Sequence, residues 1–383
     1  EQELAYALAT AISVLDELKT RVPNGEFPEL CGRLSFFVNA GIRFVTEMCK
    51  MRAFVDLWDE ILIERYGIEN PKFRRFRYGV QVNSLGLTEQ QPENNVYRIL
   101  IEMLAVTLSK KARARAVQLP AWNEALGLPR PWDQQWSMRM QQIMAFETDL
   151  LEYEDLFDGN SVVDTKVEAL KTSARYELKT IESQGGALES IDYMKSRLVE
   201  SNTLRLQNIE SKQTTVVGVN KYINTEESPL VSGDGGIMVV DPLVEKDQID
   251  RLNKWRISRN QTSVKNALNN LRTAALEGKN IMPASIEAAK AGATTGEWAQ
   301  EMRNIYGEYR GPTGVAAGIS NQTEGLDEIR SAVDAVSDKL GERLKFLIGK
   351  PGLDGHSNGA EQIASRARDC GMKIEYEGIR LTP

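Results

Sequence analysis

Apolar and polar residues recur along the chain with two different periods, and these periods predict its elements. Over residues 3–22 the apolar positions recur every three or four residues, as on the buried face of a helix. Shorter apolar runs predict strands over residues 33–38, 74–81 and 113–119. Helical patterns follow these strands over residues 42–66, from 92 onward, and over 133–152. This alternation predicts βα units that build a parallel sheet.

The middle of the chain predicts helices and little else. A highly charged helical pattern covers residues 160–212, and a segment with Gly and Pro over 228–242 predicts a loop. Further helical patterns cover residues 245–277, 283–291, 294–306 and 324–341. Because this region carries no motif with chemistry, we interpret it as a helical linker. The predicted domains are therefore 1–155, a mostly helical linker over 156–340, and 341–383.

The last part of the chain predicts the opening of a doubly wound domain. A buried-type strand over 344–348 leads into a loop rich in Gly and Pro, and a helix over 359–369 and a strand over 373–378 follow. Such domains bind ligands in the crevice beyond the carboxyl ends of their strands. The predicted fold class of the whole chain is α/β.

Polar side chains accompany the first three strands. The pattern places them at or just past the carboxyl ends, as Arg33 with Ser35, Arg77 with Gln81, and Gln118 with Glu124. In α/β barrels the carboxyl face carries the chemistry. The alternative is that these residues are loop residues and charges at strand edges.

His356 is the only histidine of the chain. A lone loop histidine is usually an exposed bystander, but its surroundings favour a ligand. Asp354 lies two residues away, where a carboxylate can hold one ring nitrogen and leave the other for a metal. Gly355 and Gly359 remove side chains beside it, as a bulky ligand against the backbone requires.

Composition and charge exclude some functions. A net charge of −7 argues against a nucleic-acid partner, because phosphate binding needs a basic face. The 3 cysteines are widely spaced, which fits a reducing cytoplasm. No apolar run approaches the ~20 residues of a membrane span, so we expect no membrane partner. The chain begins at Glu1 inside a helical pattern and ends at Pro383 after a strand, so we expect a piece of a longer protein.

The segment around His356 resembles a known motif. Asp354, His356 and Gly359 form the pattern Asp-x-His-x-x-Gly, which is similar to the cobalamin-binding motif of several mutases and methyltransferases. With Lys350 ahead of it, the segment resembles the adenosylcobalamin-dependent acyl-CoA mutases, the methylmalonyl-CoA mutase family. The resemblance implies that His356 is the lower axial ligand of cobalt. It also implies that Asp354 hydrogen-bonds the far ring nitrogen and that Lys350 joins this cluster.

Other segments resemble the same family in the same order. Arg33-Leu-Ser-Phe-Phe37 resembles the barrel strand that binds CoA phosphates, Asn70-Pro-Lys72 through Gln81 the next strand, and Asn123-Glu-Ala125 the site near the adenosyl ribose. Val217-Gly-Val-Asn-Lys-Tyr222 is typical of the segment after the barrel. The implied roles are CoA binding by Arg33, Ser35 and Lys72, an acyl pocket near Phe36 and Phe37, an active-site Gln81, and ribose binding by Glu124.

The resemblance also implies a fold and a chemistry. The expected fold is the C-terminal half of a (β/α)8 TIM barrel, a helical linker, and the start of a flavodoxin-like (Rossmann-type) cobalamin-binding domain. Adenosylcobalamin would supply the radical chemistry that moves a thioester group between carbons, while the protein positions substrate and cofactor. Lys350, Asp354 and Gln81 would be catalytic, and Gly355 and Gly359 would bind cofactor. Expected partners are an acyl-CoA, a second copy in a homodimer, and a GTPase chaperone.

Departures from the family pattern favour one branch. Methylmalonyl-type enzymes carry a Thr-Ser/His-rich strand where this chain has residues 77–81, and they differ again at 136–142 and 146–159. These departures resemble the branch that converts ethylmalonyl-CoA to methylsuccinyl-CoA. The alternatives are conversion of methylmalonyl-CoA to succinyl-CoA, a non-catalytic partner subunit, or a corrinoid-binding methyl carrier. Retention of Lys350, Asp354 and His356 argues against the partner subunit. Arg33-Leu-Ser-Phe-Phe37 and Asn123-Glu-Ala125 argue against the carrier.

Overall fold

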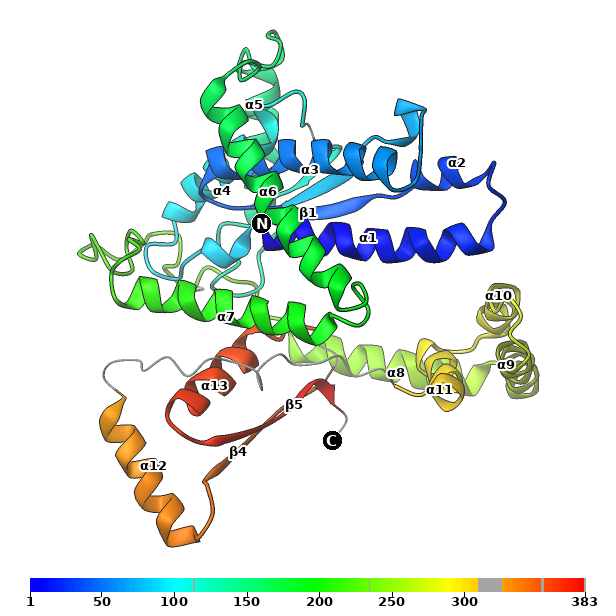
Figure 1. Cartoon of the computed structure of the whole chain (residues 1–383). Coiled ribbons are helices and arrows are strands. Elements are labelled where there is room, and N and C mark those ends of the chain that lie inside the picture. The colour runs from blue at the N-terminus through cyan, green and yellow to red at the C-terminus, as the bar shows by residue number, and fades with distance from the viewer. Residues whose placement is uncertain (113, 234, 309–325, 353–354, 382–383) are drawn as a thin grey trace. The chain divides into compact units, whose positions relative to one another are not determined.

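The computed structural model describes residues 1–112, 114–233, 235–308, 326–352 and 355–381. The chain divides into two compact units. One comprises Glu1–Met238 with Pro312–Pro383, and the other comprises Val239–Gly311. Parallel strands connected by helices make the chain a mixed α/β protein, which confirms the predicted class (Figure 1).

The first sheet is 3-stranded and parallel, in the order β1-β2-β3. Its strands are β1 (Phe36–Ala40), β2 (Tyr78–Val82) and β3 (Ala116–Gln118). Helices α1 (Gln2–Arg21) and α2 (Phe27–Cys31) precede β1, α3 (Phe44–Glu64) connects β1 to β2, α4 (Asn94–Thr107) connects β2 to β3, and α5 (Pro131–Phe146) follows. Two 3-10 turns, η1 (Pro71–Phe73) and η2 (Ser84–Gly86), flank β2. The βα alternation read from the sequence is therefore present.

The sequence pattern was wrong about which end of the strands some polar residues occupy. Arg33 and Ser35 precede β1 and Arg77 precedes β2, so they lie at the amino ends. The backbone explains the shift of β1: the N–H groups of Arg33 and Leu34 bond back to Leu30 and Cys31, so they are engaged in the turn after α2. Sheet pairing begins only at Phe36, whose N–H donates to the carbonyl of Arg77 (2.9 Å).

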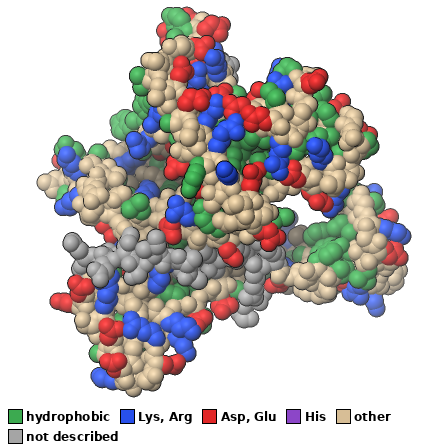
Figure 2. All heavy atoms as spheres, in the orientation of Figure 1, with side chains coloured by type: hydrophobic (Ala, Val, Ile, Leu, Met, Phe, Trp, Pro, Cys, Tyr) green, Lys and Arg blue, Asp and Glu red, His purple; other side chains and the backbone are tan. Residues whose placement is uncertain are grey.

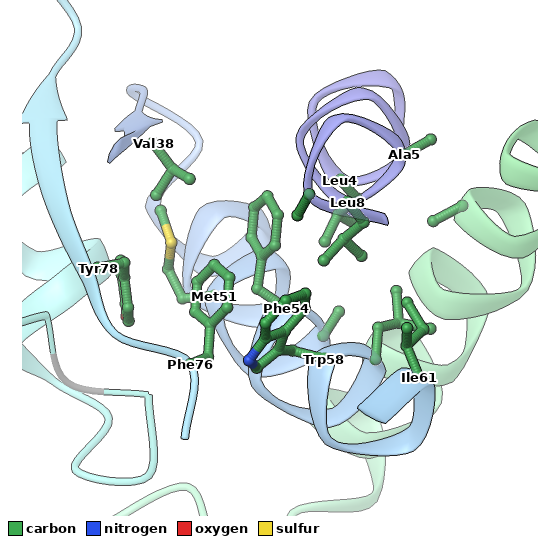
Figure 3. Close-up of a cluster of buried hydrophobic side chains, with 14 of the residues drawn as sticks. Leu4, Ala5, Leu8, Val38, Met51, Phe54, Trp58, Ile61, Phe76 and Tyr78 are labelled. Atoms are coloured by element: carbon green, nitrogen blue, oxygen red, sulfur yellow. The ribbon is translucent and has the colours of Figure 1, made fainter. Parts of the chain in front are cut away.

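A hydrophobic core joins the first sheet to α1 and α3. Figure 3 shows Leu4 and Leu8 of α1, Phe54 and Trp58 of α3, and Val38 of β1 pointing into one cluster. All five side chains are almost completely buried. Burial of each such large side chain stabilises the fold by about 1.5–3 kcal/mol.

Helix α6 (Ser161–Ser183) packs on α1 and α3, and α7 (Ile191–Glu210) follows it. The apolar residues of α6 join the same core, and the ammonium of Lys171 on α6 lies 2.7 Å from the Glu60 carboxylate of α3. The predicted linker over 156–340 thus begins with a helix that packs against the sheet's helices. The predicted domain boundaries stay predictions.

The unit Val239–Gly311 is helical in its described part. It contains α8 (Pro242–Ser258), α9 (Gln261–Leu276), α10 (Met282–Ala291) and α11 (Thr295–Tyr306). Small apolar side chains allow α9 to pack closely on α10 and α11. Arg259 pairs with Glu297 (2.5 Å), which also caps α11, and these hydrogen bonds lower the pKa of Glu297 to about 2.

The C-terminal part of the first unit contains the predicted strand, helix and strand. Helix α12 (Asp327–Leu340) precedes β4 (Lys345–Pro351), and α13 (Asn358–Asp369) connects β4 to β5 (Lys373–Leu381). The two strands pair in parallel, and α13 packs on both through Ile348 and Ala364. This βαβ order is the one that the sequence predicts.

Figure 2 shows acidic and basic side chains interspersed on the face in view, without one continuous basic surface there. In the part of the chain that the structure describes, no helix is both long and apolar enough to cross a membrane.

A buried acid in α4 predicts how stability changes with pH. Glu102 is 1% exposed, and its Oε2 atom has no hydrogen-bond partner among the described residues. Burial and the nearby charge of Glu47 raise the pKa of Glu102 to about 8, against the opposing charge of Arg98. When folding raises the pKa of a carboxyl group, the free energy of unfolding is highest at pH values below the pKa of the unfolded state. It then decreases as the pH rises through the pKa of the folded state.

We therefore expect ionisation of Glu102 to lower the free energy of unfolding by about 4 kcal/mol between about pH 4.5 and pH 8. Glu102→Gln should remove this part of the pH dependence, so the variant should be more stable than wild type at pH 9 and nearly equal at pH 4. Denaturant titrations of both proteins across this range measure the difference. Parallel stability curves for the two proteins would contradict the assignment.

Candidate functional site

The first sheet has one face covered by helices and one open face. Val38 and Val80 are buried against the helices, and Val117 packs there too. Because side chains alternate along a strand and the strands pair in register, the other face carries two cross-strand rows. These rows are Phe37–Gly79–Ala116 and Asn39–Gln81–Gln118. Every residue of these rows is half-buried or exposed, and we call this surface the open face.

Phe37 leans across its neighbour on the open face. Its side chain is 60% exposed, and its ring lies 3.1 Å from where a Cβ at Gly79 would be. A side chain at position 79 would therefore displace the ring. The structure places Phe37 and Gln81 on the same face, as expected for two residues of one pocket.

Cationic side chains gather at the amino ends of the strands. A pocket of about 440 Å³ lies there, and we call it the amino-end pocket. Its charged lining residues are Arg33, Lys72, Arg75, Arg77, Arg115 and one acid, Glu29. Guanidinium groups bind phosphate oxygens through paired charge-assisted hydrogen bonds, so this pocket suits a phosphorylated ligand.

The amino-end pocket contains two residues that the sequence predicts as CoA-binding residues, and others for which it predicts no such role. Arg33 and Lys72 both line it, whereas Ser35 lies exposed at the same end of β1 and is not one of its lining residues. Arg75 and Arg115 were missed. The available signal was that both lie near the first residue of a predicted strand, 74–81 or 113–119, as amino-end residues do. Arg77 also donates to the carbonyl of Gly32 (2.8 Å), which holds the turn that carries Arg33.

A rigid loop follows the carboxyl end of β3 and carries Glu124. The buried carboxylate of Asp133 accepts hydrogen bonds from Trp122 (2.9 Å), Asn123 (2.8 Å) and Arg130 (2.9 Å). Burial alone would raise the pKa of Asp133, but these bonds lower it below its usual range. Glu124, next to Asn123, is exposed at this end. Gln81 and Glu124 thus lie at or beyond the carboxyl ends, as the sequence predicts.

The second candidate site is the loop between β4 and α13. The Lys350 ammonium donates to the carbonyl oxygen of His356 (2.8 Å), so the structure brings these two residues together. His356 is exposed. The third predicted member, Asp354, lies outside the described residues.

The two glycines of this loop differ in the space that lies beside them. Apart from its chain neighbours and the backbone of its own helix, no atom of the described residues lies within 4 Å of where a Cβ at Gly359 would be, so the space beside it is open. A Cβ at Gly355 would meet the guanidinium of Arg380 at 2.7 Å, so that position tolerates no side chain without a shift. Among the described residues, no group of 3 or more His, Cys, Asp or Glu side chains could hold a metal alone. A cobalt ion carried by a macrocycle needs one protein ligand, so His356 with its open glycine fits cobalamin.

These features define an α/β protein with a cationic pocket at one end of a parallel sheet and a loop that contains glycines after the first strand of a second sheet. Comparison with known proteins identifies its family. The family model described as methylmalonyl-CoA mutase matches residues 1–308, and the chain belongs to this family.

Individual relatives match the chain from end to end. It is 73% identical over 383 residues to an ethylmalonyl-CoA mutase of Cereibacter sphaeroides, of which it covers 59%. It is 60% identical over 387 residues to an ethylmalonyl-CoA mutase of Methylorubrum extorquens, of which it covers 56%. It is 30% identical over 394 residues to a methylmalonyl-CoA mutase of Escherichia coli, of which it covers 54%. All three matches include 100% of this chain, which spans little more than half the length of these curated relatives.

Proposed function

We propose that this chain is part of an adenosylcobalamin-dependent acyl-CoA mutase that converts ethylmalonyl-CoA to methylsuccinyl-CoA. The observation that carries the proposal is the identity of 73% and 60% over the whole chain to proteins named ethylmalonyl-CoA mutase. Proteins named methylmalonyl-CoA mutase reach 30% over the same length. The arrangement of the two candidate sites supports the same function.

The sheet β1-β2-β3 represents the C-terminal half of a (β/α)8 barrel in this proposal. Its parallel register supports this, as does the placement of its connecting helices on one face. The open face would then line the barrel interior. The β4-α13-β5 unit represents the start of a flavodoxin-like cobalamin-binding domain, and its glycine-rich loop lies at the carboxyl end of β4.

The amino-end pocket supports a specific path for the substrate. Arg33 and Lys72 would bind the CoA phosphates there, with Ser35 beside them. Gln81 lies about 13 Å further along β2 than Arg77, at about 3.3 Å per residue. The acyl group would therefore reach Phe37 and Gln81 by way of an extended arm along the open face. Placement of the arginines at the amino ends, which corrects the sequence prediction, is what this path requires.

The loop after β4 would hold the cofactor. His356 would bind the cobalt, Asp354 would orient its imidazole, and Lys350 would fix the loop through the His356 carbonyl. Gly359 would let the macrocycle approach the backbone, Gly355 would do so once the Arg380 guanidinium moves aside, and Glu124 would bind the ribose. When bound, adenosylcobalamin supplies a carbon-centred radical that starts the rearrangement. This chain's residues bind and orient the substrate and keep water away.

The remaining expectations stay predictions from the resemblance. They are an acyl-CoA as substrate, a homodimer, a GTPase chaperone that loads the cofactor, and a cytoplasmic location.

An assay of the full-length parent protein tests the proposal. Ethylmalonyl-CoA and methylmalonyl-CoA are supplied in separate assays, each with and without adenosylcobalamin. The products are separated by chromatography because substrate and product are isomers of equal mass. We expect methylsuccinyl-CoA to form only with the cofactor. No product from ethylmalonyl-CoA or methylmalonyl-CoA would overturn the proposal and favour the non-catalytic partner subunit.

A further inference from the structure

Asn39 occupies a position on the open face to which no role has been assigned. It pairs in register with Gln81, which in turn pairs with Gln118. In a parallel sheet, residues in register project to the same side. The row therefore presents three amide side chains side by side, next to the row that contains Phe37.

The backbone of Asn39 is fixed by side chains from two helices. Its N–H donates to Oε1 of Glu3 on α1 (2.7 Å), and its carbonyl accepts from the ammonium of Lys50 on α3 (2.8 Å). Lys50 is 8% exposed and also contacts Oε2 of Glu3 (2.5 Å) and the carboxylate of Glu47. Two carboxylates thus face this one ammonium, so the charge of the buried ammonium is compensated.

The side chain of Asn39, in contrast, makes no hydrogen bond to any described residue and is exposed. Two charged residues thus hold one backbone position of β1 in place, while the Asn39 amide projects onto the open face with no partner among the described residues. A binding residue on a rigid element with its backbone locked by supporting contacts is the arrangement that precise ligand recognition requires.

We infer that Asn39 is a further substrate-binding residue, whose amide donates a hydrogen bond to a carbonyl or carboxylate oxygen of the acyl group. Glu3 and Lys50 are its positioning residues. The inference rests on the proposed function, because the acyl-CoA is the substrate of that proposal. It adds a contact on β1 to the predicted contact from Gln81 on β2.

Substitutions of Asn39 in the full-length parent test the inference. We expect Asn39→Ala to lower kcat/KM for ethylmalonyl-CoA about tenfold or more, as loss of one hydrogen bond to a charged or strongly polar group does. Asn39→Asp should lower it further, because a carboxylate cannot donate and repels the anionic acyl group. The inhibition constant of free CoA should stay within about twofold of wild type, since CoA lacks the acyl group that Asn39 contacts.

Asn270→Ala, an exposed asparagine on α9, is the matched control and should leave both constants unchanged. Equal losses in kcat/KM and in CoA binding for Asn39→Ala would show that Asn39 acts only through the fold, and would overturn the inference. So would wild-type kcat/KM in both Asn39 variants. An inactive wild-type parent would instead overturn the proposed function, so the two failures are distinguishable.

Discussion

Replacement of His356 by Ala in the full-length parent is expected to abolish both tight binding of adenosylcobalamin and mutase turnover. His356 is the only histidine of the chain, so no other imidazole in it can substitute as axial ligand. Removing the side chain leaves the glycine-rich loop without a donor for cobalt, while the Lys350 contact to the backbone carbonyl at position 356 is retained. The loop should therefore keep its shape and lose its metal ligand.

Two measurements separate this outcome from unfolding. Titration with adenosylcobalamin, followed by absorbance, should show a loss of affinity of about a hundredfold or more, as removal of a metal ligand costs at least as much as removal of a supporting contact. Binding of free CoA should be unchanged. Lys345→Ala is the control at the opposite end of β4, where an exposed ion pair with Glu342 contributes little. Wild-type cofactor affinity in His356→Ala would refute the axial-ligand assignment.

Charge reversal in the amino-end pocket is the second large expected effect. Arg33→Glu replaces a cation, which we propose binds phosphate, by an anion among Lys72, Arg77 and Arg115. We expect KM for ethylmalonyl-CoA to rise about a hundredfold, because a charge-assisted hydrogen bond is worth about 1.5–3 kcal/mol and repulsion adds to its loss. kcat at saturating substrate should change little, since the pocket lies far from the acyl group.

A truncated substrate provides the internal test of that assignment. Ethylmalonyl-pantetheine has no phosphates, so its kcat/KM should be the same for wild type and Arg33→Glu. Arg21→Glu reverses the charge of an exposed arginine at the end of α1 and should behave as wild type with both substrates. Equal losses with the full and truncated substrates would mean that Arg33 does not bind the phosphates.

The order of helices and strands was predictable because each element has a local period. The apolar spacing of α1 and the strand, loop, helix and strand after residue 341 were read correctly from neighbouring residues alone. The first residue of β1 was not predicted correctly. Leu34 continues the apolar run of the strand, but its N–H bonds to Cys31 in a turn, and periodicity does not reveal where a backbone donor is already used.

The candidate site was predictable only in part, and for the same reason. The resemblance selected Arg33, Lys72 and Gln81 one by one, but it did not show that Arg75 and Arg115 complete one pocket with the first two. Residues far apart in sequence meet there because three parallel strands begin at one level. The hydrogen bonds of Glu3 and Lys50 with the Asn39 backbone likewise depend on how α1 and α3 pack beside β1. Nothing local marks such contacts.

Direct competition between two substrates tests whether ethylmalonyl-CoA is the preferred substrate. Ethylmalonyl-CoA and methylmalonyl-CoA are offered together, at equal concentration, to the full-length parent with adenosylcobalamin. The ratio of initial rates then equals the ratio of the two kcat/KM values. We expect methylsuccinyl-CoA to predominate over succinyl-CoA. Predominance of succinyl-CoA would contradict the proposed substrate, and absence of both products would contradict the proposed activity.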